Sequence, residues 1–220
     1  GEQLRALARD SGLAVLGSGQ LGWRNGGSED ALILGALQSR DVASGHPELA
    51  SAPLIMLGIS GGGPGAFGMT QRQASRVAAF ALLVPSGLST FLSAAAQQVP
   101  GYVSLAELDE VVDNVTTTQD YLNNRAAGAI WGLAVEHDVG HEELSQEART
   151  ALVNWITTAV GLRLPASPGG ALRGVAESSG WLGNRTTYEI APYASYVSGP
   201  LGASWPPTGA NSPGRSNTTS

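Results

Sequence analysis

The chain contains no cysteine, so a disulfide framework, a thiolate nucleophile and a cysteine metal site are all excluded. Charged residues are scarce at 14%, and 12 basic against 18 acidic residues give a net charge of -6 with no basic run. This balance argues against a nucleic-acid partner and against an anionic membrane surface. Long apolar segments are also missing, because none approaches the ~20 residues that a membrane span needs.

The size and composition predict one main globular domain. The chain has 220 residues, 42% of them apolar, which is enough to bury a single core. We expect the main domain over residues 1–164, a loop-rich extension packed on it over 165–205, and a disordered tail over 206–220. The first residues, GEQLRALARD, are typical of an amphipathic helix rather than a signal peptide.

Three Asn-x-Thr triplets match the acceptor pattern for N-glycosylation. They begin at Asn114, Asn184 and Asn217. The triplets favour an extracellular protein, with a cytoplasmic one as the alternative.

Helical and strand-like patterns alternate along the chain. Short apolar runs predict strands, and capping residues, prolines and amphipathic periodicity predict the helices between them. The expected strands are 13–16, 52–58, 77–84, 102–106 and 130–135. The expected helices are 2–10, 28–43, 64–74, 89–98, 116–127 and 143–160. This order predicts an α/β fold, a mostly parallel sheet with helices on both faces.

One strand end carries a serine among glycines. Residues 54–67 read LIMLGISGGGPGAF, in which Gly58-Ile59-Ser60-Gly61-Gly62 fits the pattern G-x-S-x-G between a strand and a helix. In that context the serine sits on a sharp, strained turn, and its neighbours must be small so that backbone can come close. The pattern predicts that Ser60 is a nucleophile. The simpler alternative is a glycine turn whose serine only caps the helix.

Two glycine patterns offer a phosphate-binding alternative. Residues 61–66 fit G-x-G-x-x-A after a strand, but the next strand ends Leu83-Val84-Pro85 without the acid that a dinucleotide ribose requires. Residues 17–22 fit G-x-G-x-x-G, but a loop follows them where a helix should begin. The missing acid and the missing helix therefore disfavour a nucleotide cofactor at either pattern.

A serine nucleophile needs a base and an acid. Of the three histidines, His46 lies in a polar turn, whereas His137 and His141 follow the last expected strand, and Gly140 before His141 favours it as the base. A metal site using His137 and His141 would require a helix, which Val139-Gly140 makes unfavourable, so no metal is expected. The acid candidates are Glu107, Asp109, Glu110, Asp113 and Asp138. Asp109, just past a strand, is preferred, which gives the chain order serine, acid, histidine.

These residues resemble the α/β-hydrolase superfamily. The resemblance covers about residues 2–164 and rests on SGHPELASAPLIMLGISGGGPGA, on AELDE and on RAAGAIWGLAVEHDVGHE. Among its members the chain is most similar to lid-poor esterases of the dienelactone-hydrolase, feruloyl-esterase and polyester-depolymerase groups. The resemblance implies that an ester is cleaved through an acyl-enzyme without a cofactor. It assigns Ser60 as nucleophile, His141 as base, Asp109 as acid and the Gly61 N–H as one oxyanion donor.

The chain departs from the family pattern at its start. Relatives take a second oxyanion donor from a loop that precedes a helix like residues 2–10, and the first strands of the usual sheet are not evident here. This departure leaves open a non-catalytic or truncated protein of the same fold, with a binding or structural role. The short connection between residues 84 and 102 leaves no room for a cap domain, and an open site suits a bulky or polymeric substrate. The expected substrate is a small-molecule or polymeric ester. Tryptophans at 131, 155, 181 and 205 are expected mainly in the core when they lie on helices or strands, with the lining of a substrate groove as the alternative.

Overall fold

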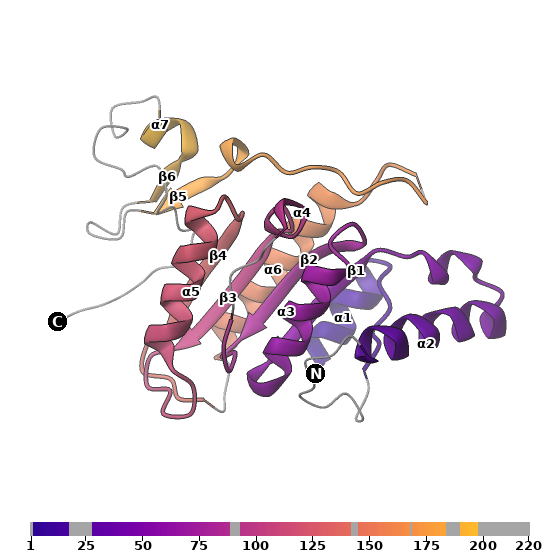
Figure 1. Cartoon of the computed structure of the whole chain (residues 1–220), viewed down its shortest axis with the longest axis horizontal. Coiled ribbons are helices and arrows are strands. Elements are labelled where there is room, and N and C mark those ends of the chain that lie inside the picture. The colour runs from indigo at the N-terminus through magenta and orange to yellow at the C-terminus, as the bar shows by residue number, and fades with distance from the viewer. Residues whose placement is uncertain are drawn as a thin grey trace.

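The centre of the molecule is a four-stranded parallel sheet (Figure 1). It is seen in a computed structural model that describes residues 2–17, 28–88, 93–141, 145–167, 169–183 and 190–197. The strands lie in the order β1-β2-β3-β4 and neighbouring strands are parallel. They are β1 (Leu54–Ile59), β2 (Val77–Leu83), β3 (Gly101–Ala106) and β4 (Trp131–Glu136). The predicted α/β class and parallel sheet are confirmed.

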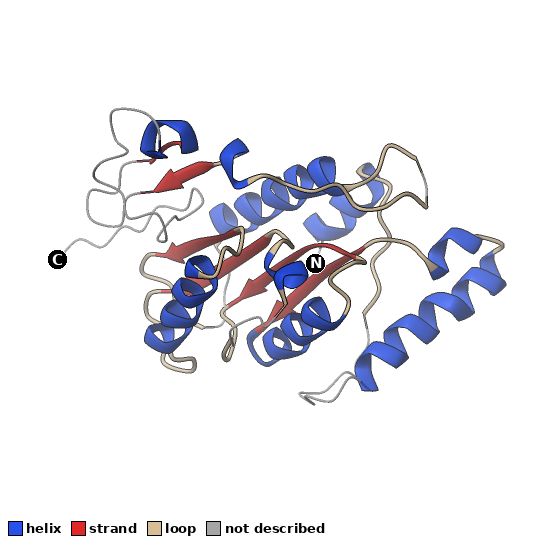
Figure 2. Ribbon diagram, turned by 45° about the horizontal axis from the view of Figure 1, so that its top comes forward, coloured by secondary structure: helices blue, strands red, loops and turns tan. Residues whose placement is uncertain are grey.

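Helices cover both faces of this sheet (Figures 1 and 2). One face carries α3 and α5, and the other carries α6 with α1 beside it. The helices are α1 (Glu2–Asp10), α2 (Ser28–Ser44), α3 (Gly63–Arg72), α4 (Ala94–Gln97), α5 (Asn114–Ala126) and α6 (Gln146–Arg163), with 3-10 turns η1 (Pro47–Ala50) and η2 (Ser60–Gly62). The expected helices are thus present, although the ranges 89–92 and 142–144 lie outside the described residues.

The core follows the alternation of side chains along the strands. β2 is buried along its whole length. Its Phe80 and Leu82 pack in the cluster under α3 and α5, and Ala81 and Leu83 pack in the cluster under α6. Because successive side chains of a strand point to opposite faces, one continuous apolar run serves both clusters. The clusters hold the sheet rigidly, and with it the loops at the carboxyl ends of the strands.

One of the expected strands is absent. Residues 13–16 form no strand; they run as irregular chain, with Val15 66% and Leu16 50% exposed. A short apolar run becomes a strand only where a neighbouring strand pairs with it, and periodicity cannot supply that information. In the described part of the chain β1 lies at an edge of the sheet, with Leu57 36% exposed.

The chain beyond α6 forms small separate elements. They are η3 (Glu177–Ser179), a two-stranded antiparallel sheet of β5 (Trp181–Gly183) and β6 (Ile190–Pro192), and α7 (Tyr193–Val197). The Arg125 guanidinium of α5 pairs with Glu177, and the Arg173 N–H donates to the Arg163 carbonyl at 2.8 Å. Residues 198–220 lie outside the described residues, so the expected domain boundaries and tail remain predictions. Among the described helices, none is long and apolar enough to cross a membrane.

An ion pair joins α2 to α3. The Arg72 guanidinium donates to both Asp30 carboxylate oxygens, Nε to Oδ2 at 3.0 Å and Nη2 to Oδ1 at 2.7 Å, and Gln73 donates to Oδ2 at 3.3 Å. The Asp30 residue is only 6% exposed. The hydrogen bond from Arg72 is the main reason that the pKa of Asp30 lies below its ordinary value, although burial opposes the shift.

Asp30→Asn is expected to lower the free energy of unfolding at pH 7 by about 1–2 kcal/mol, a value reduced because Arg72 is partly exposed. The folded pKa is depressed, so this stability is present above the unfolded pKa of about 3.9 and is lost as the pH falls through the folded value. Urea unfolding at pH 7 and at pH 3 measures the difference. Asp41→Asn, on the same helix, is the control. A loss in Asp30→Asn that is equally large at both pH values would contradict the role of the ion pair.

Candidate functional site

Ser60 lies on a strained turn where β1 ends. The chain passes from β1 directly into η2 and then α3. Ser60 has φ of 49°, in the left-handed region that residues other than glycine seldom adopt. Such a conformation costs of order 1–3 kcal/mol and persists only where the surroundings impose it. The sharp strand-to-helix turn predicted from G-x-S-x-G is therefore present.

The glycines around Ser60 allow very close backbone approach. A Cβ atom at Gly58 would lie 2.7 Å from the Gly62 carbonyl oxygen and 2.8 Å from the Gly63 Cα. A Cβ at Gly63 would lie 2.7 Å from the Cβ of Pro85, in the loop that follows β2. Neither position has room for a side chain, so these glycines are required by the packing of the turn.

Gly58→Ala is expected to destabilise the protein by at least about 2 kcal/mol, because the atoms that the new methyl meets belong mostly to backbone. The matched control is Gly65→Ala in α3, where an added Cβ meets nothing within 4 Å. Alanine there should change stability by less than about 1 kcal/mol. Thermal unfolding of both variants measures the contrast, and equal stabilities would show that the turn is not tightly packed.

The loop after β2 supports the same turn from the other side. The Ser86 N–H donates to the Ser60 carbonyl at 3.2 Å, and its hydroxyl donates to the same oxygen at 3.4 Å. Val84, at the start of this loop, has φ of 42°. Ser86 was not among the residues predicted for the site. The available signal was its position after the carboxyl end of a strand, the edge at which sites form in parallel sheets.

Asp109 is held in the loop after β3. Its Oδ1 accepts hydrogen bonds from the N–H groups of Val111 at 2.8 Å and Val112 at 3.0 Å, and Oδ2 lies 2.8 Å from Nδ1 of His141. The side chain is completely buried. Burial alone would raise the pKa of Asp109, but the hydrogen bonds from His141, Val112 and Val111 outweigh it and keep the pKa below its ordinary value. Asp109 is thus a fixed carboxylate.

His141 joins Asp109 to Ser60. It lies in the loop after β4, with its side chain 15% exposed. Its Nε2 lies 2.8 Å from the Ser60 hydroxyl oxygen, while its Nδ1 faces Asp109. The three side chains expected from the sequence therefore meet in one continuous series of hydrogen bonds, which we call the relay. It connects the ends of β1, β3 and β4.

The other acid candidates have different partners. Asp113 caps α5, accepting from the Thr116 N–H at 3.0 Å and from the Thr116 hydroxyl at 2.6 Å. Glu107 and Asp138 lie against His137 rather than His141. Glu110 is exposed. Asp113, Glu107 and Asp138 are therefore engaged with other residues, and Asp109 is the candidate whose carboxylate contacts His141.

The other histidines also lie apart from the relay. Nδ1 of His46 is 2.8 Å from Glu48 in an exposed pair. His137 contacts Glu107 and Asp138, whereas His141 contacts Asp109 and Ser60. The pairing of His137 with Glu107 was not identified from the sequence, because nothing local relates residues 30 positions apart.

The tryptophans do not share one role. Trp131 is fully buried and makes edge-to-face contacts with Phe67 and Phe80 in the core. Trp155, on α6, packs on Tyr102 of β3, with ring centroids 5.7 Å apart. Trp131 lies in the core and Trp155 packs against it partly buried, which agrees with the preferred interpretation for these two tryptophans. Trp181 is 52% exposed, and Trp205 lies outside the described residues.

The chain is similar to several solved structures at low sequence identity. A protein from Bacillus cereus is 17% identical, with a TM-score of 0.52 over 72% of this chain and 54% of that one. SOBER1 from Arabidopsis thaliana is 18% identical, with a TM-score of 0.46 over 60% of this chain and 64% of that one. A predicted CIB-like hydrolase from Thermoplasma acidophilum is 17% identical, with a TM-score of 0.46 over 67% of this chain and 68% of that one.

Sequence comparison adds no closer relative: no protein-family model and no curated protein matches the chain. The chain spans less than two thirds of the length of SOBER1 and of the Bacillus cereus protein. At these identities the likeness is one of fold, and it agrees with the parallel sheet covered by helices on both faces. The chain therefore shares an α/β fold with the Bacillus cereus protein, with a parallel sheet between two layers of helices.

Proposed function

We propose that the protein is a serine hydrolase that cleaves carboxylic esters through an acyl-enzyme on Ser60. The observation that carries this proposal is the relay, with 2.8 Å from Asp109 to His141 and 2.8 Å from His141 to Ser60. A serine hydroxyl is a weak nucleophile at neutral pH, and a base in direct contact activates it. The left-handed Ser60 and its glycine neighbours support the same role, since they present the hydroxyl at a tight turn.

Each member of the relay has a defined task in this reaction. His141 Nε2 takes the proton as Ser60 Oγ attacks the ester carbonyl, and His141 then gives the proton to the departing alcohol. A water molecule then attacks the acyl-enzyme while His141 takes its proton, and the ester bond to Ser60 breaks to release the carboxylic acid and restore the serine hydroxyl. Asp109 holds His141 with Nε2 toward the serine and stabilises the imidazolium that forms.

The Gly61 N–H is the proposed oxyanion donor. Gly61 follows Ser60 at the start of the η2 turn that leads into α3. The first N–H groups of a helical segment have no acceptor within it, and they carry partial positive charge. An oxyanion formed next to Ser60 would meet such groups. A second donor is not assigned.

The substrate class and location are proposals as well. A small or polymeric ester is proposed, without a cofactor, a nucleic-acid partner or a membrane partner. An extracellular location remains a proposal, and the Asn114 triplet does not support it in the folded chain. The Asn114 amide nitrogen, which would carry the glycan, donates to the Ala106 carbonyl at 2.7 Å. Asn184 and Asn217 lie outside the described residues.

A fluorophosphonate probe tests the nucleophile directly. The folded protein should be labelled covalently, and mass spectrometry should place the label on Ser60. Activated Ser60 makes labelling fast at neutral pH. Absence of labelling in the folded, full-length protein would favour the rival, a non-catalytic protein of this fold with a binding or structural role.

A further inference from the structure

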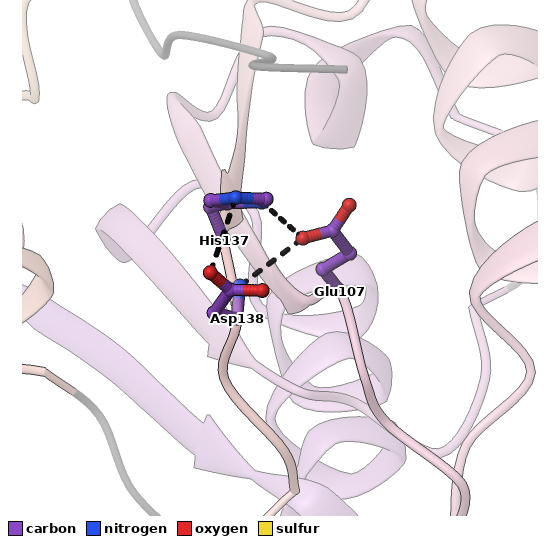
Figure 3. Close-up of side chains that lie close together, drawn as sticks. All are labelled: Glu107, His137 and Asp138. Carbon is purple, nitrogen blue, oxygen red and sulfur yellow. Dashed lines mark hydrogen bonds and ion pairs between the residues drawn. The ribbon is translucent and has the colours of Figure 1, made fainter. Parts of the chain in front are cut away.

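A second cluster of polar side chains lies near the relay. Glu107 follows β3, and His137 and Asp138 follow β4; one side-chain ligand atom from each lies within 4.8 Å of the other two. The imidazole of His137 lies between the carboxylates, with Nδ1 against Glu107 and Nε2 3.2 Å from Asp138 (Figure 3). Elsewhere in the described part of the chain, no other group of three such residues comes this close.

Backbone hydrogen bonds fix the places of these three residues. The Glu107 N–H donates to the Glu136 carbonyl at 2.9 Å, and the Leu108 N–H donates to the Val139 carbonyl at 2.9 Å. The backbone pairing of β3 with β4 thus continues past both strand ends. It uses the carbonyls of Glu136 and Val139, and the two residues between them, His137 and Asp138, form a bulge. The Asp138 N–H donates to the Glu107 carboxylate at 3.1 Å. The cluster is therefore organised before any ligand arrives.

The chemistry of the cluster suits a divalent transition metal. One imidazole nitrogen with two carboxylate oxygens is a ligand set that Zn²⁺ accepts, whereas Mg²⁺ and Ca²⁺ prefer oxygen alone. Tetrahedral bonds of about 2.0–2.1 Å place ligand atoms about 3.3 Å apart, so the 4.8 Å group must contract around an ion. Asp138 must also turn from Nε2 of His137 toward an ion on Nδ1, and its exposed side chain has room to do so. The side chains of Glu107, His137 and Asp138 are 33%, 47% and 77% exposed, which leaves room for water ligands.

We propose that Glu107, His137 and Asp138 bind a divalent transition-metal ion, with Zn²⁺ as the probe, at a site separate from the relay. An ion there joins the loop that carries Asp109 to the loop that carries His141. Those residues lie two positions after Glu107 and four after His137, so the bound ion braces the loops on which the relay depends. The proposal does not depend on ester hydrolysis, since binding is measured without a substrate.

Calorimetric titration of the full chain with Zn²⁺ should give one binding site, and Zn²⁺ should raise the midpoint of thermal unfolding. The main variant is Asp138→Asn. Asp138 has φ of 56°, a conformation that asparagine also tolerates, so this variant removes the charge and preserves the backbone. Its affinity for Zn²⁺ should fall by at least about 10-fold.

Three further variants complete the test. His137→Asn removes the nitrogen ligand and should also weaken binding by at least about 10-fold. His46→Asn is the matched control, because it breaks another exposed His–Glu pair, and it should leave the affinity unchanged. Ser60→Ala should bind Zn²⁺ as the wild type does, which separates this site from the relay. The proposal is overturned if the folded protein binds no Zn²⁺ at millimolar concentration, or if binding survives both Asp138→Asn and His137→Asn unchanged.

Discussion

Ser60→Ala is expected to reduce the turnover of an activated ester, such as a p-nitrophenyl ester, by about 10⁴ to 10⁶-fold. The physical reason is that no other group can form the acyl-enzyme once the hydroxyl is removed, although His141 and Asp109 remain in place. Fluorophosphonate labelling should vanish together with turnover. Measuring kcat and KM separately should show that the loss lies in kcat, because substrate contacts other than Oγ persist.

The matched control for this variant is Ser39→Ala. Ser39 is an exposed serine of α2, and its hydroxyl donates to the Gly35 carbonyl at 2.8 Å. It is not a member of the relay. It should retain wild-type turnover. If Ser60→Ala kept its activity, the nucleophile would have to lie elsewhere. A labelled wild type that hydrolyses none of the tested esters would instead indicate an activated serine with a different acyl substrate.

Local chemistry made the turn at Ser60 predictable. A strand, a serine and closely spaced glycines occur within residues 54–67, and each glycine requirement acts over a few residues. The parallel sheet was equally accessible, because continuous apolar runs alternate with helical ones over most of the chain. Both inferences depend on short stretches of sequence, which is why they could be made without coordinates.

Pairing across the sheet was harder to foresee. Five acids were candidates, and the choice among them depends on which loop reaches His141 across 32 positions of sequence. The Asp109 carboxylate is fixed by hydrogen bonds that it accepts from the N–H groups of Val111 and Val112, which no sequence pattern indicates. The contact of Glu107 with His137 and the support of the turn by Ser86 are long-range in the same way. Residues 13–16 were misjudged for the related reason that a strand requires a partner.

Asp109→Asn is expected to lower kcat by about 10³ to 10⁴-fold while the fold is preserved. The asparagine oxygen can still accept from the N–H groups of Val111 and Val112, so the loop keeps its shape. Its amide group, however, now donates toward Nδ1 of His141. The proton of the neutral imidazole must then sit on Nε2, where it blocks acceptance of the proton from Ser60.

The control for this substitution is Asp113→Asn, four residues away in the same loop region. Asp113 caps α5 through the Thr116 N–H, and asparagine is an equally good cap, so stability and turnover should stay near wild type. A rate loss in Asp113→Asn together with an active Asp109→Asn would reassign the acid. Because both variants make the same change of carboxylate to amide, a loss confined to Asp109→Asn would come from the direct contact of Asp109 with His141, which sets the tautomer and stabilises the imidazolium, rather than from a general loss of negative charge.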